Sequence, residues 1–507
     1  MQHIQGEDRN QMFMFSLESA IPTDAFVRVV DAFVDSVDLK SFGFAHVECE
    51  EEGRPAYHPS ILLKLYLYGY RYGIRTTRKL EREAQTNIEA MWLLSGLRPK
   101  YKTIADFRKN HSKAFREVFR RFVLLLKEWN LIEGETVAID SFKIRGSNSL
   151  KNNFNERKLK HHLAYIDKQI EDYEALLDSN DKEEEKKELT KKIEERKAKR
   201  TKYEQIKKDL DESGQEQIST TDPDSRSVIL HKNIINVGYN IQASSDSKHK
   251  LLVEYDTGPV NDTHALAPIA LQTKETLGVE SIKVLADKGY HTGVQLKECD
   301  DNGIETYVSP RDPSPQSEGL YPYTMFHYNK ETDSYTCPAG STLTTHGRWY
   351  KHSESRKGRK SMVYYFKRYS TPDCKTCEQR IKCTKSKHKI RNIDRSEFAE
   401  IVEANNKRVT QNPAYYRQRQ QVTEHMFGTL KRQRGFTHAL VRKKDNVLGE
   451  VGLMFIGYNL SRCISILGAE KLIKTLKECC LHHLSHIKWL ILSLFKDLKV
   501  YALKISI

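Results

Sequence analysis

Residues 156–214 form a highly charged segment that no compact sheet can contain. The segment is dense in Lys and Glu and nearly free of Gly and Pro, so it favours helix. Apolar residues follow a heptad spacing, first clearly and then more weakly. The pattern predicts an antiparallel helical hairpin or a dimeric coiled coil, with a solvated charged helix as an open alternative for the second half. The seam residues are Leu163, Ile166, Ile170, Tyr173 and Leu177, then Leu189, Ile193, Tyr203, Ile206 and Leu210.

Two aspartates, one on each side of this insertion, follow short runs of apolar and β-branched residues. Such runs indicate buried strands, so Asp140 and Asp287 are expected at strand ends. A third acid, Glu424, lies in an Arg- and Gln-rich stretch without Gly or Pro between Ala414 and Phe427, which predicts a helix. Taken singly, each is an ordinary cap or solvated acid. Together they suit a pair of divalent cations, because Mg²⁺ selects carboxylate oxygens.

Short motifs flank these acids in a fixed order. They are Thr-Asp-Pro-Asp-Ser-Arg at 221–226, Val-Gly-Tyr-Asn-Ile-Gln at 237–242, Asn-Asp-Thr at 261–263, Ala-Asp-Lys-Gly-Tyr at 286–290 and Tyr-Arg-Gln-Arg at 416–419. In this order they resemble the DDE transposases of bacterial insertion sequences, over about Tyr57 to Gly468. Glu424 and Lys431 keep the family's six intervening residues. Arg419 and Glu424 have four residues between them, where many relatives have three.

The resemblance implies an enzyme that cleaves DNA at the ends of its element and joins the freed 3′-hydroxyls to target DNA. Asp140, Asp287 and Glu424 would be its catalytic residues and would bind Mg²⁺, with Mn²⁺ as a substitute. It also implies double-stranded DNA as partner, both terminal repeats and target, and a homodimer in the active complex. Two other functions stay open: a transposase-derived DNA-binding protein without catalysis, and a metal-dependent nuclease without strand transfer. The implied DNA contacts are Lys431, Arg419 and Tyr416.

The resemblance also implies a fold class, α/β with an RNase H-like mixed sheet flanked by helices. The residue pattern agrees, because early strands are followed by alternating helix and strand and then by the Glu424 helix. The expected elements are strands near Asn236–Ala243 and Lys250–Thr257, a helix over Asp262–Leu277, the Asp287 strand, a helix near Val294–Asn302 and a strand over Glu305–Val308.

The stretch from Arg54 to Arg121 is strongly basic. It holds sixteen Lys and Arg against five Asp and Glu, a net charge of +11 in a chain of +15. Its pattern predicts helices over 59–72, over 76–86 and from about Thr103, with Thr103 and Asp106 as an N-terminal capping pair. Short basic helices suit a helix-turn-helix-like DNA reader, although a helical bundle whose cations face water is the alternative. The candidate DNA contacts are Arg71, Arg75 and Arg78.

Four of the nine cysteines cluster in the region between Asp287 and Glu424. A Cys-x-x-Cys pair is one half of a tetrahedral zinc site, and two further cysteines would complete it. Reduced structural thiols are the alternative. The surrounding region is basic and aromatic, so it either contacts nucleic acid through stacked rings or forms a small β-rich module with a basic outer face. The four candidate zinc ligands are Cys337, Cys374, Cys377 and Cys383.

The predicted organisation has an N-terminal helical DNA-binding domain over 1–125 and a catalytic domain over 126–468. Insertions at 156–214 (helical hairpin or coiled coil) and 320–395 (basic and cysteine-containing) interrupt the catalytic domain, and the tail over 469–507 has no assigned role. No apolar run has the length of a membrane span, and the N-terminus lacks the pattern of a signal peptide. We therefore expect a soluble protein of the bacterial cytoplasm, associated with the nucleoid and not with a membrane.

Overall fold

The computed structural model describes residue 14 and the ranges 16–48, 55–231, 234–312, 318–352 and 363–479. Most of the predicted tail therefore lies outside the described residues. The chain divides into two compact units. Unit 1 comprises Met1–Ile132, Lys248–Leu252 and His425–Ile507, and unit 2 comprises Glu133–Ser247 and Val253–Glu424.

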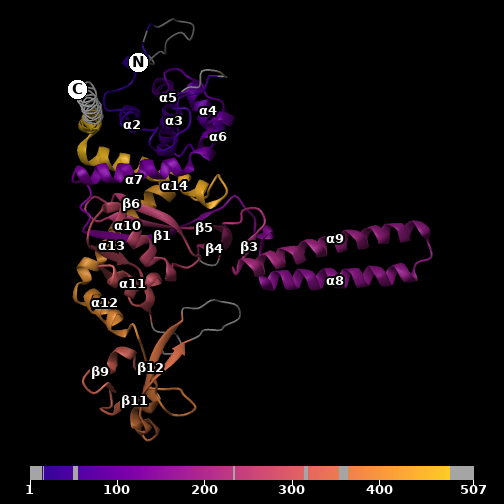
Figure 1. Ribbon diagram of the computed structural model, residues 1–507, viewed down its shortest axis with the longest axis vertical. Coiled ribbons are helices and arrows are strands. Elements are labelled where there is room, and N and C mark those ends of the chain that lie inside the picture. Colours follow the sequence, from indigo (N-terminus) through magenta and orange to yellow (C-terminus); the bar gives the residue numbers. More distant parts are fainter. Residues whose placement is uncertain are drawn as a thin grey trace, which may run out of the picture. The chain divides into compact units, whose positions relative to one another are not determined.

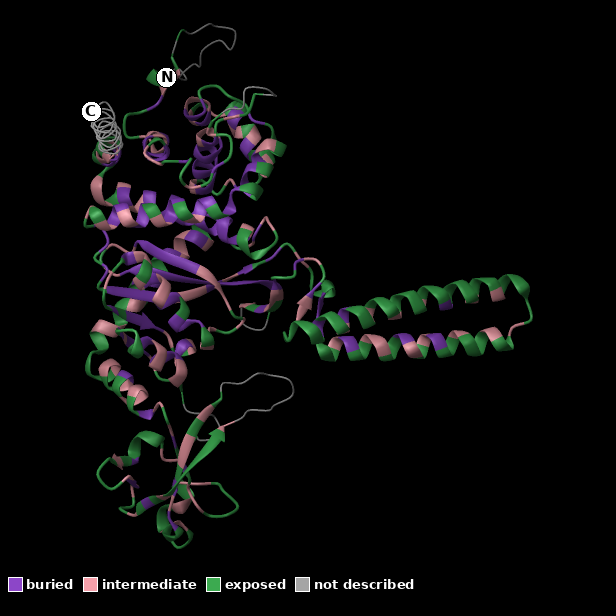
Figure 2. Ribbon diagram, in the orientation of Figure 1, coloured by how far each residue is buried: buried purple, intermediate pink, exposed green. Residues whose placement is uncertain are grey.

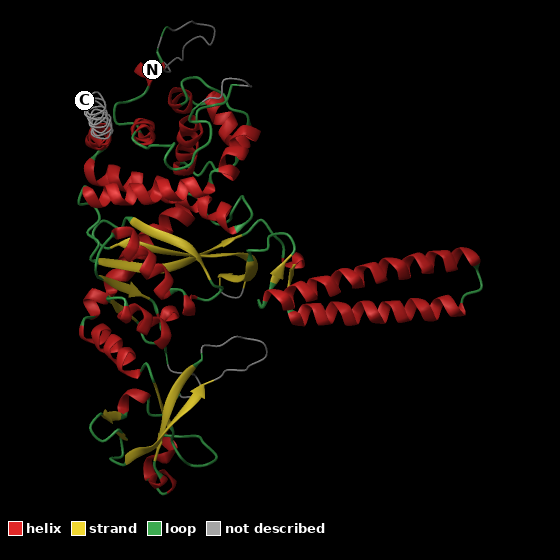
Figure 3. Ribbon diagram, viewed as in Figure 1, coloured by secondary structure: helices red, strands yellow, loops and turns green. Residues whose placement is uncertain are grey.

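Unit 1 is built from helices (Figure 3). Its longest helix, α14 (Lys444–Leu467), packs on α7 and α3, and every residue from Val447 to Leu460 is buried. A helix that is apolar on all sides is buried in this way when other helices surround it. The other helices are α1 (Leu17–Ala20), α2 (Phe26–Asp35), α3 (Pro59–Arg71), α4 (Thr77–Thr86), α5 (Ile88–Leu93), α6 (Tyr101–Asn110), α7 (Ser112–Glu128), the π-helical η8 (Gly428–Gln433) and the helix Ala469–Cys479.

Among the described residues, no single helix is long and apolar enough to cross a membrane. Helix α14 and the helix Ala469–Cys479 reach that length and composition only as a pair, which is bent by 114°.

The predicted capping pair of α6 is wrong. The helix begins at Tyr101, so Thr103 and Asp106 lie inside it and do not cap its start. The backbone N–H of Tyr101 instead donates to Oε2 of Glu81, on α4, at 3.1 Å. A carboxylate satisfies a free N–H at a helix start as well as a local cap does. This partner lies on another helix, where local sequence gives no sign of it.

Unit 2 is organised around a six-stranded sheet with the order β4-β5-β1-β7-β8, in which β6 also pairs with β5. Strand β1 is antiparallel to β5 and parallel to β7, and β7 is parallel to β8. The predicted strands are present, and β4 is an additional one. The strands are β1 (Thr136–Arg145), β4 (Arg226–His231), β5 (Ile234–Asp246), β6 (Leu252–Gly258), β7 (Ile282–Ala286) and β8 (Ile304–Val308).

The helices of unit 2 include α13, on which Glu424 lies. Val422 of α13 packs with Ala138 on β1, Leu285 on β7 and Tyr307 on β8, so this helix is fixed against the sheet. The predicted helix over 262–277 is a short 3-10 turn followed by α10. The elements are η2 (Asp262–His264), α10 (Leu266–Leu277), η3 (Lys288–Tyr290), α11 (Gly293–Asp301), α12 (Ala399–Gln411) and α13 (Pro413–Phe427).

The charged insertion is a helical hairpin within one chain. Helices α8 (Glu156–Ser179) and α9 (Glu183–Ser213) lie side by side (Figure 1), and most of their residues are exposed (Figure 2). At the base, η1 (Leu150–Asn152) precedes β2 (Asn153–Phe154), which pairs with β3 (Ile218–Ser219). Predicted seam residues take part in two buried clusters. One contains Ile166, Ile170 and Ile193. The other contains Ile206 and Leu210 together with Phe154 and Leu159, which the seam pattern did not include.

The cysteine module, which we define as residues 320–395, contains a second sheet with the order β13-β12-β11-β10-β9. This matches the β-rich alternative for the region. Its core is a small buried cluster of Phe326, Tyr335, Leu343, Tyr369 and Ile393. The elements are η5 (Tyr323–Met325), β9 (His327–Asn329), β10 (Ser334–Thr336), β11 (Thr342–His352), β12 (Tyr364–Ser370), η6 (Pro372–Lys375), η7 (Glu378–Lys382) and β13 (Ile393–Ser396).

Candidate active site

Strand pairing brings Asp140 and Asp287 to the same edge of the central sheet. Strands β1 and β7 are parallel, with Ala138 opposite Leu285. Each aspartate follows two residues later in its own strand direction. Because neighbouring strands lie only about 4.8 Å apart, two residues at equivalent positions beyond a parallel pair are neighbours. Asp287 directly follows the end of β7, as predicted. The predicted strand end at Asp140 is wrong, because β1 continues to Arg145 and its buried Phe142 and Ile144 keep it paired with β5.

Asp140 is partly buried and has one cationic partner. Its Oδ1 accepts a hydrogen bond from the backbone N–H of Ser141 at 2.7 Å, and its Oδ2 lies 3.2 Å from Nη1 of Arg419. Burial raises the pKa of Asp140 to about 6, and the negative charges of Asp287 and Asp262 add to the rise. The Ser141 N–H and Arg419 act in the opposite direction. The raised pKa of Asp140 thus comes mainly from burial, with the neighbouring carboxylates as a smaller cause.

A glycine keeps open the space beside these carboxylates. The N–H of Gly289 donates to Oδ1 of Asp287 at 2.8 Å. A Cβ at this position would lie 2.9 Å from that same oxygen and 3.8 Å from Oδ2 of Asp262. Any larger residue would therefore fill the space between the two carboxylates.

Asp262 belongs to this cluster, although it was not among the predicted site residues. Its Oδ1 accepts hydrogen bonds from Nδ2 of Asn240 and Nε2 of Gln242, both at 2.8 Å. The buried Tyr290 hydroxyl donates to Oε1 of Gln242, which fixes this amide. A signal was present in the sequence, because Asn240 and Gln242 are polar residues two apart that alternate with Tyr239, Ile241 and Ala243. Buried amides in such a strand need hydrogen-bonding partners.

Glu424 lies on the predicted helix, but its side chain is directed differently from that of Arg419. The residue is exposed, and its Oε1 accepts a hydrogen bond from Nε2 of Gln420 at 2.8 Å. Five positions along an α-helix correspond to a rotation of about 500°, so Arg419 and Glu424 lie on different sides of α13. Arg419 reaches Asp140 in consequence, whereas Glu424 pairs within its own helix. The longer spacing noted in the sequence therefore has a direct structural effect.

Tyr416 also points to the sheet. Its hydroxyl donates to the backbone oxygen of Ala286 at 3.3 Å, directly before Asp287. The neighbouring Tyr415 hydroxyl is 2.7 Å from Oγ1 of Thr136 on β1. These contacts position α13 across the strand ends.

The acidic cluster offers the type of ligand atom that a hard cation prefers. Asp140, Asp262 and Asp287 gather oxygen ligands around space that only glycine leaves open, and Arg419 supplies positive charge. Carboxylates in such a cluster repel one another unless a cation offsets them. Across the described ranges, however, no three His, Cys, Asp or Glu side chains are arranged to hold a metal ion. In this structure Asp140 contacts Arg419 and Glu424 contacts Gln420, so both carboxylates have partners other than a metal ion.

The expected DNA contact at Arg75 is contradicted by the structure. Its guanidinium is buried and lies 2.7 Å from Oε1 of Glu450, which is itself fully buried. It also donates to the backbone oxygens of Gly435 and His438. A buried carboxylate needs a cationic partner, so Arg75 serves the interior of unit 1. Local sequence could not show this, because Glu450 is distant in the chain.

The remaining predicted DNA contacts in unit 1 are accessible in part. Arg78 is exposed and lies 5.3 Å from the ring centre of Tyr101. Arg71 is half-buried, with its guanidinium 5.6 Å from the ring of Phe26. Lys431 lies on η8, and its exposure is intermediate.

Two parts of the chain match known families. Residues 15–110 match a transposase domain (DUF772), and residues 336–464 match a transposase DDE domain. Both matched models describe transposase domains, and together they support a DDE-type transposase. The second match contains Glu424, Lys431 and most of the cysteine module, and it begins after both aspartates.

The other comparisons add little. No curated protein matches the chain. Among solved structures, a cryo-EM structure of a piggyBac transposase synaptic complex with hairpin DNA matches with 10% identity and a TM-score of 0.31. This match covers 91% of the chain and 80% of that structure's chain. A likeness at this level carries no argument about fold or function.

Proposed function

We propose that the chain is an active transposase that binds the ends of its insertion sequence, cleaves them and joins the 3′-hydroxyl ends to target DNA. The observation that carries this proposal is the parallel register of β1 and β7, which brings Asp140 and Asp287 together at one edge of the sheet. The strand order β6-β5-β1-β7-β8, with β1 antiparallel to β5 and parallel to β7, supports an RNase H-like core.

Asp140, Asp287 and Glu424 would hold Mg²⁺. When bound, the cations would stabilise negative charge on the attacking and leaving oxygens of the phosphoryl transfer. For this, Arg419 has to leave Asp140 and Glu424 has to leave Gln420. The contact of Glu424 with Gln420 is exposed and breaks at small cost. The Arg419–Asp140 pair is partly buried, so the bound cations would have to replace the positive charge of Arg419 beside Asp140.

Asp262 would act as a positioning residue in this site. Asn240 and Gln242 hold its carboxylate in place, and its charge acts on Asp140. Arg419, once released from Asp140, would be free to contact a DNA phosphate, which is the role that the family resemblance implies. Tyr416 keeps α13 on the sheet through its contact with Ala286.

Recognition of the DNA ends would rest on the basic helices of unit 1. Arg71, Arg78 and Lys431 are the candidate contacts, and the stretch from Arg54 to Arg121 carries a net charge of +11. Phosphate contacts of this kind make binding strongly salt-dependent. We infer a homodimer in the active complex, acting on double-stranded DNA in a bacterial cytoplasm.

The test uses supercoiled DNA that carries the ends of the element, incubated with the full chain and Mg²⁺. Element ends joined to a new site would support the transposase. Cleavage without joining would instead indicate a nuclease, and binding without cleavage would indicate a DNA-binding protein. Asp287→Asn is the matched control, because it changes a carboxylate to an amide of the same shape.

A further inference from the structure

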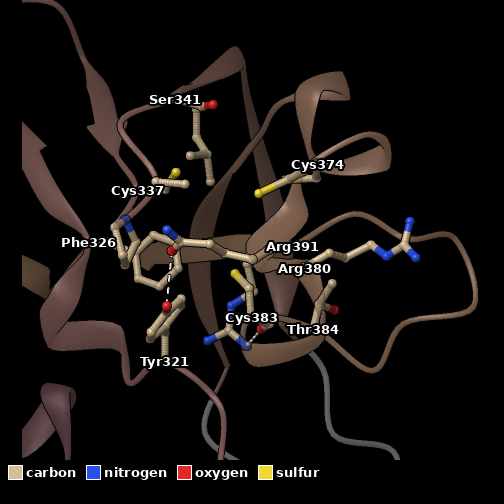
Figure 4. Close-up of a pocket in the computed structure, with 14 residues that line it drawn as sticks. Tyr321, Phe326, Cys337, Ser341, Cys374, Arg380, Cys383, Thr384 and Arg391 are labelled. Atoms are coloured by element: carbon tan, nitrogen blue, oxygen red, sulfur yellow. Dashed lines mark hydrogen bonds between the residues drawn. The ribbon is translucent and has the colours of Figure 1, made fainter.

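Four thiols lie around one small cavity in the cysteine module. The cavity has a volume of about 20 Å³, and all four candidate ligands line it. Figure 4 shows the side chains of Cys337, Cys374 and Cys383 around the same space. A volume of this size holds a single water-sized particle, since about 10–15 Å³ is enough for one water. The cavity is therefore large enough for one ion.

Each thiol is presented by a hydrogen-bonded turn. Cys337 follows β10, and its backbone oxygen accepts from the N–H of Gly340 at 2.9 Å, where φ is +83°. Cys377 and Cys383 cap the two ends of η7, and Cys374 lies on η6. Tight turns that carry Cys-x-x-Cys are the usual way in which a chain presents two sulfurs to one metal ion.

The part of the module that carries three of these thiols has no hydrophobic explanation. None of the residues from Pro372 to Asn392 is buried, and Ile381 is 80% exposed. The segment nonetheless adopts two defined 3-10 turns, η6 and η7. A small domain with too little buried apolar surface usually depends on a disulfide or a metal. All four of these cysteines are unpaired thiols in the structure.

The charges around the cavity suit a metal ion bound by thiolates. Arg380 and Arg391 line it, and Nη1 of Arg391 donates to the backbone oxygen of Cys383 at 3.2 Å. Two cations are therefore at hand to offset the charge of a four-thiolate site.

We propose that Cys337, Cys374, Cys377 and Cys383 bind one structural zinc ion that holds the segment Pro372–Asn392 to the sheet of the module. Four soft sulfur ligands select zinc over hard cations. The thiols of the described structure are not yet at ligand positions, so binding requires their side chains to turn into the cavity that they already line. The proposal does not depend on the transposase activity.

The experiment measures the metal content of the full chain, purified under reducing conditions. We expect about one zinc per chain, and replacement by Co²⁺ should give the absorption of a four-thiolate site. A Cys374→Ser/Cys377→Ser double variant should lose the metal. Cys479→Ser is the matched control and should keep it, because this cysteine is remote in sequence and lies on the last described helix.

Because the double variant could fail to fold, thiol alkylation of the unaltered chain provides a second measurement. The four cysteines should be protected until a chelator is added, and their alkylation should then rise at least about 10-fold. Reduced protein without stoichiometric zinc, or thiols that react equally with and without chelator, would overturn the proposal.

Discussion

The central sheet and the cysteine module are both built mainly of β-strands, but they are stabilised differently. In the central sheet every residue of β5 from Val237 to Asp246 is buried. In the module only Leu343 of the eleven residues of β11 is buried. The first sheet is held by a deep core, so it can tolerate clustered carboxylates at its edge. The second has five core residues and needs a further source of stability.

The largest expected effect is the loss of activity on changing Asp140 to Asn. This removes a charge from the central cluster, and loss of one charge-stabilising group usually lowers the rate by roughly 100- to 1000-fold. Asp394→Asn in the module is the control, because Asp394 forms an exposed ion pair with Arg368. Rates of strand cleavage in Mg²⁺ measure both. Equal losses would mean that the carboxylates of the two regions are not functionally different.

The same leucine truncation in each sheet compares their cores directly. Leu285 and Leu343 are both fully buried, so each Leu→Ala change should cost about 2–5 kcal/mol of folding free energy. We expect Leu343→Ala to open the module alone, because its core is small. Leu285→Ala should weaken the central sheet without opening it. Hydrogen exchange across unit 2 distinguishes the two, and exchange that spreads equally from both sites would show one shared core.

The two regions should respond to acid with opposite signs. The pKa of Asp140 is raised from 3.8 to about 6, so without divalent cations its contribution to stability is lost as pH rises from 3.8 towards 6. The pKa of Asp333 is lowered to about 2, chiefly by its hydrogen bonds with Lys367 and Tyr369. Its contribution is present above 3.8 and is lost as pH falls towards 2.

Thermal unfolding in a chelator over this pH range, with Asp140→Asn and Asp333→Asn for comparison, measures both contributions. Each variant should flatten the pH dependence only in its own window. A change in the other window would mean that the titrating group has been misidentified.

The smallest effect on the central sheet should come from deleting residues 156–213 and closing the gap with a short flexible linker. The hairpin has its own buried clusters, so the sheet should keep its unfolding temperature within a few degrees. Circular dichroism measures this. Folded protein that no longer cleaves DNA would show that the hairpin organises the active complex. Insoluble protein would contradict the prediction that the central sheet folds without the hairpin.

Local patterns were sufficient to predict a strand at Asp140, the strand that precedes Asp287 and the helix that carries Glu424, although β1 continues beyond Asp140 to Arg145. They could not give the register of β1 against β7, because pairing between distant strands depends on the whole sheet. The buried pair of Arg75 with Glu450 and the cap of α6 by Glu81 were missed for the same reason. Asp262 could have been predicted, since the buried amides of Asn240 and Gln242 in β5 need a hydrogen-bonding partner.

The pairing of β2 with β3 has a practical consequence. Asn153 lies opposite Ser219, so the chain leaves and re-enters the body of unit 2 at nearly the same point. The tip between Ser179 and Glu183 is exposed or half-buried. A fluorescent protein or affinity label inserted at this tip would lie far from the acidic edge of the sheet. Both ends of the hairpin would still be held by the pairing of β2 with β3. That loop is therefore a suitable handle for following the enzyme on single DNA molecules.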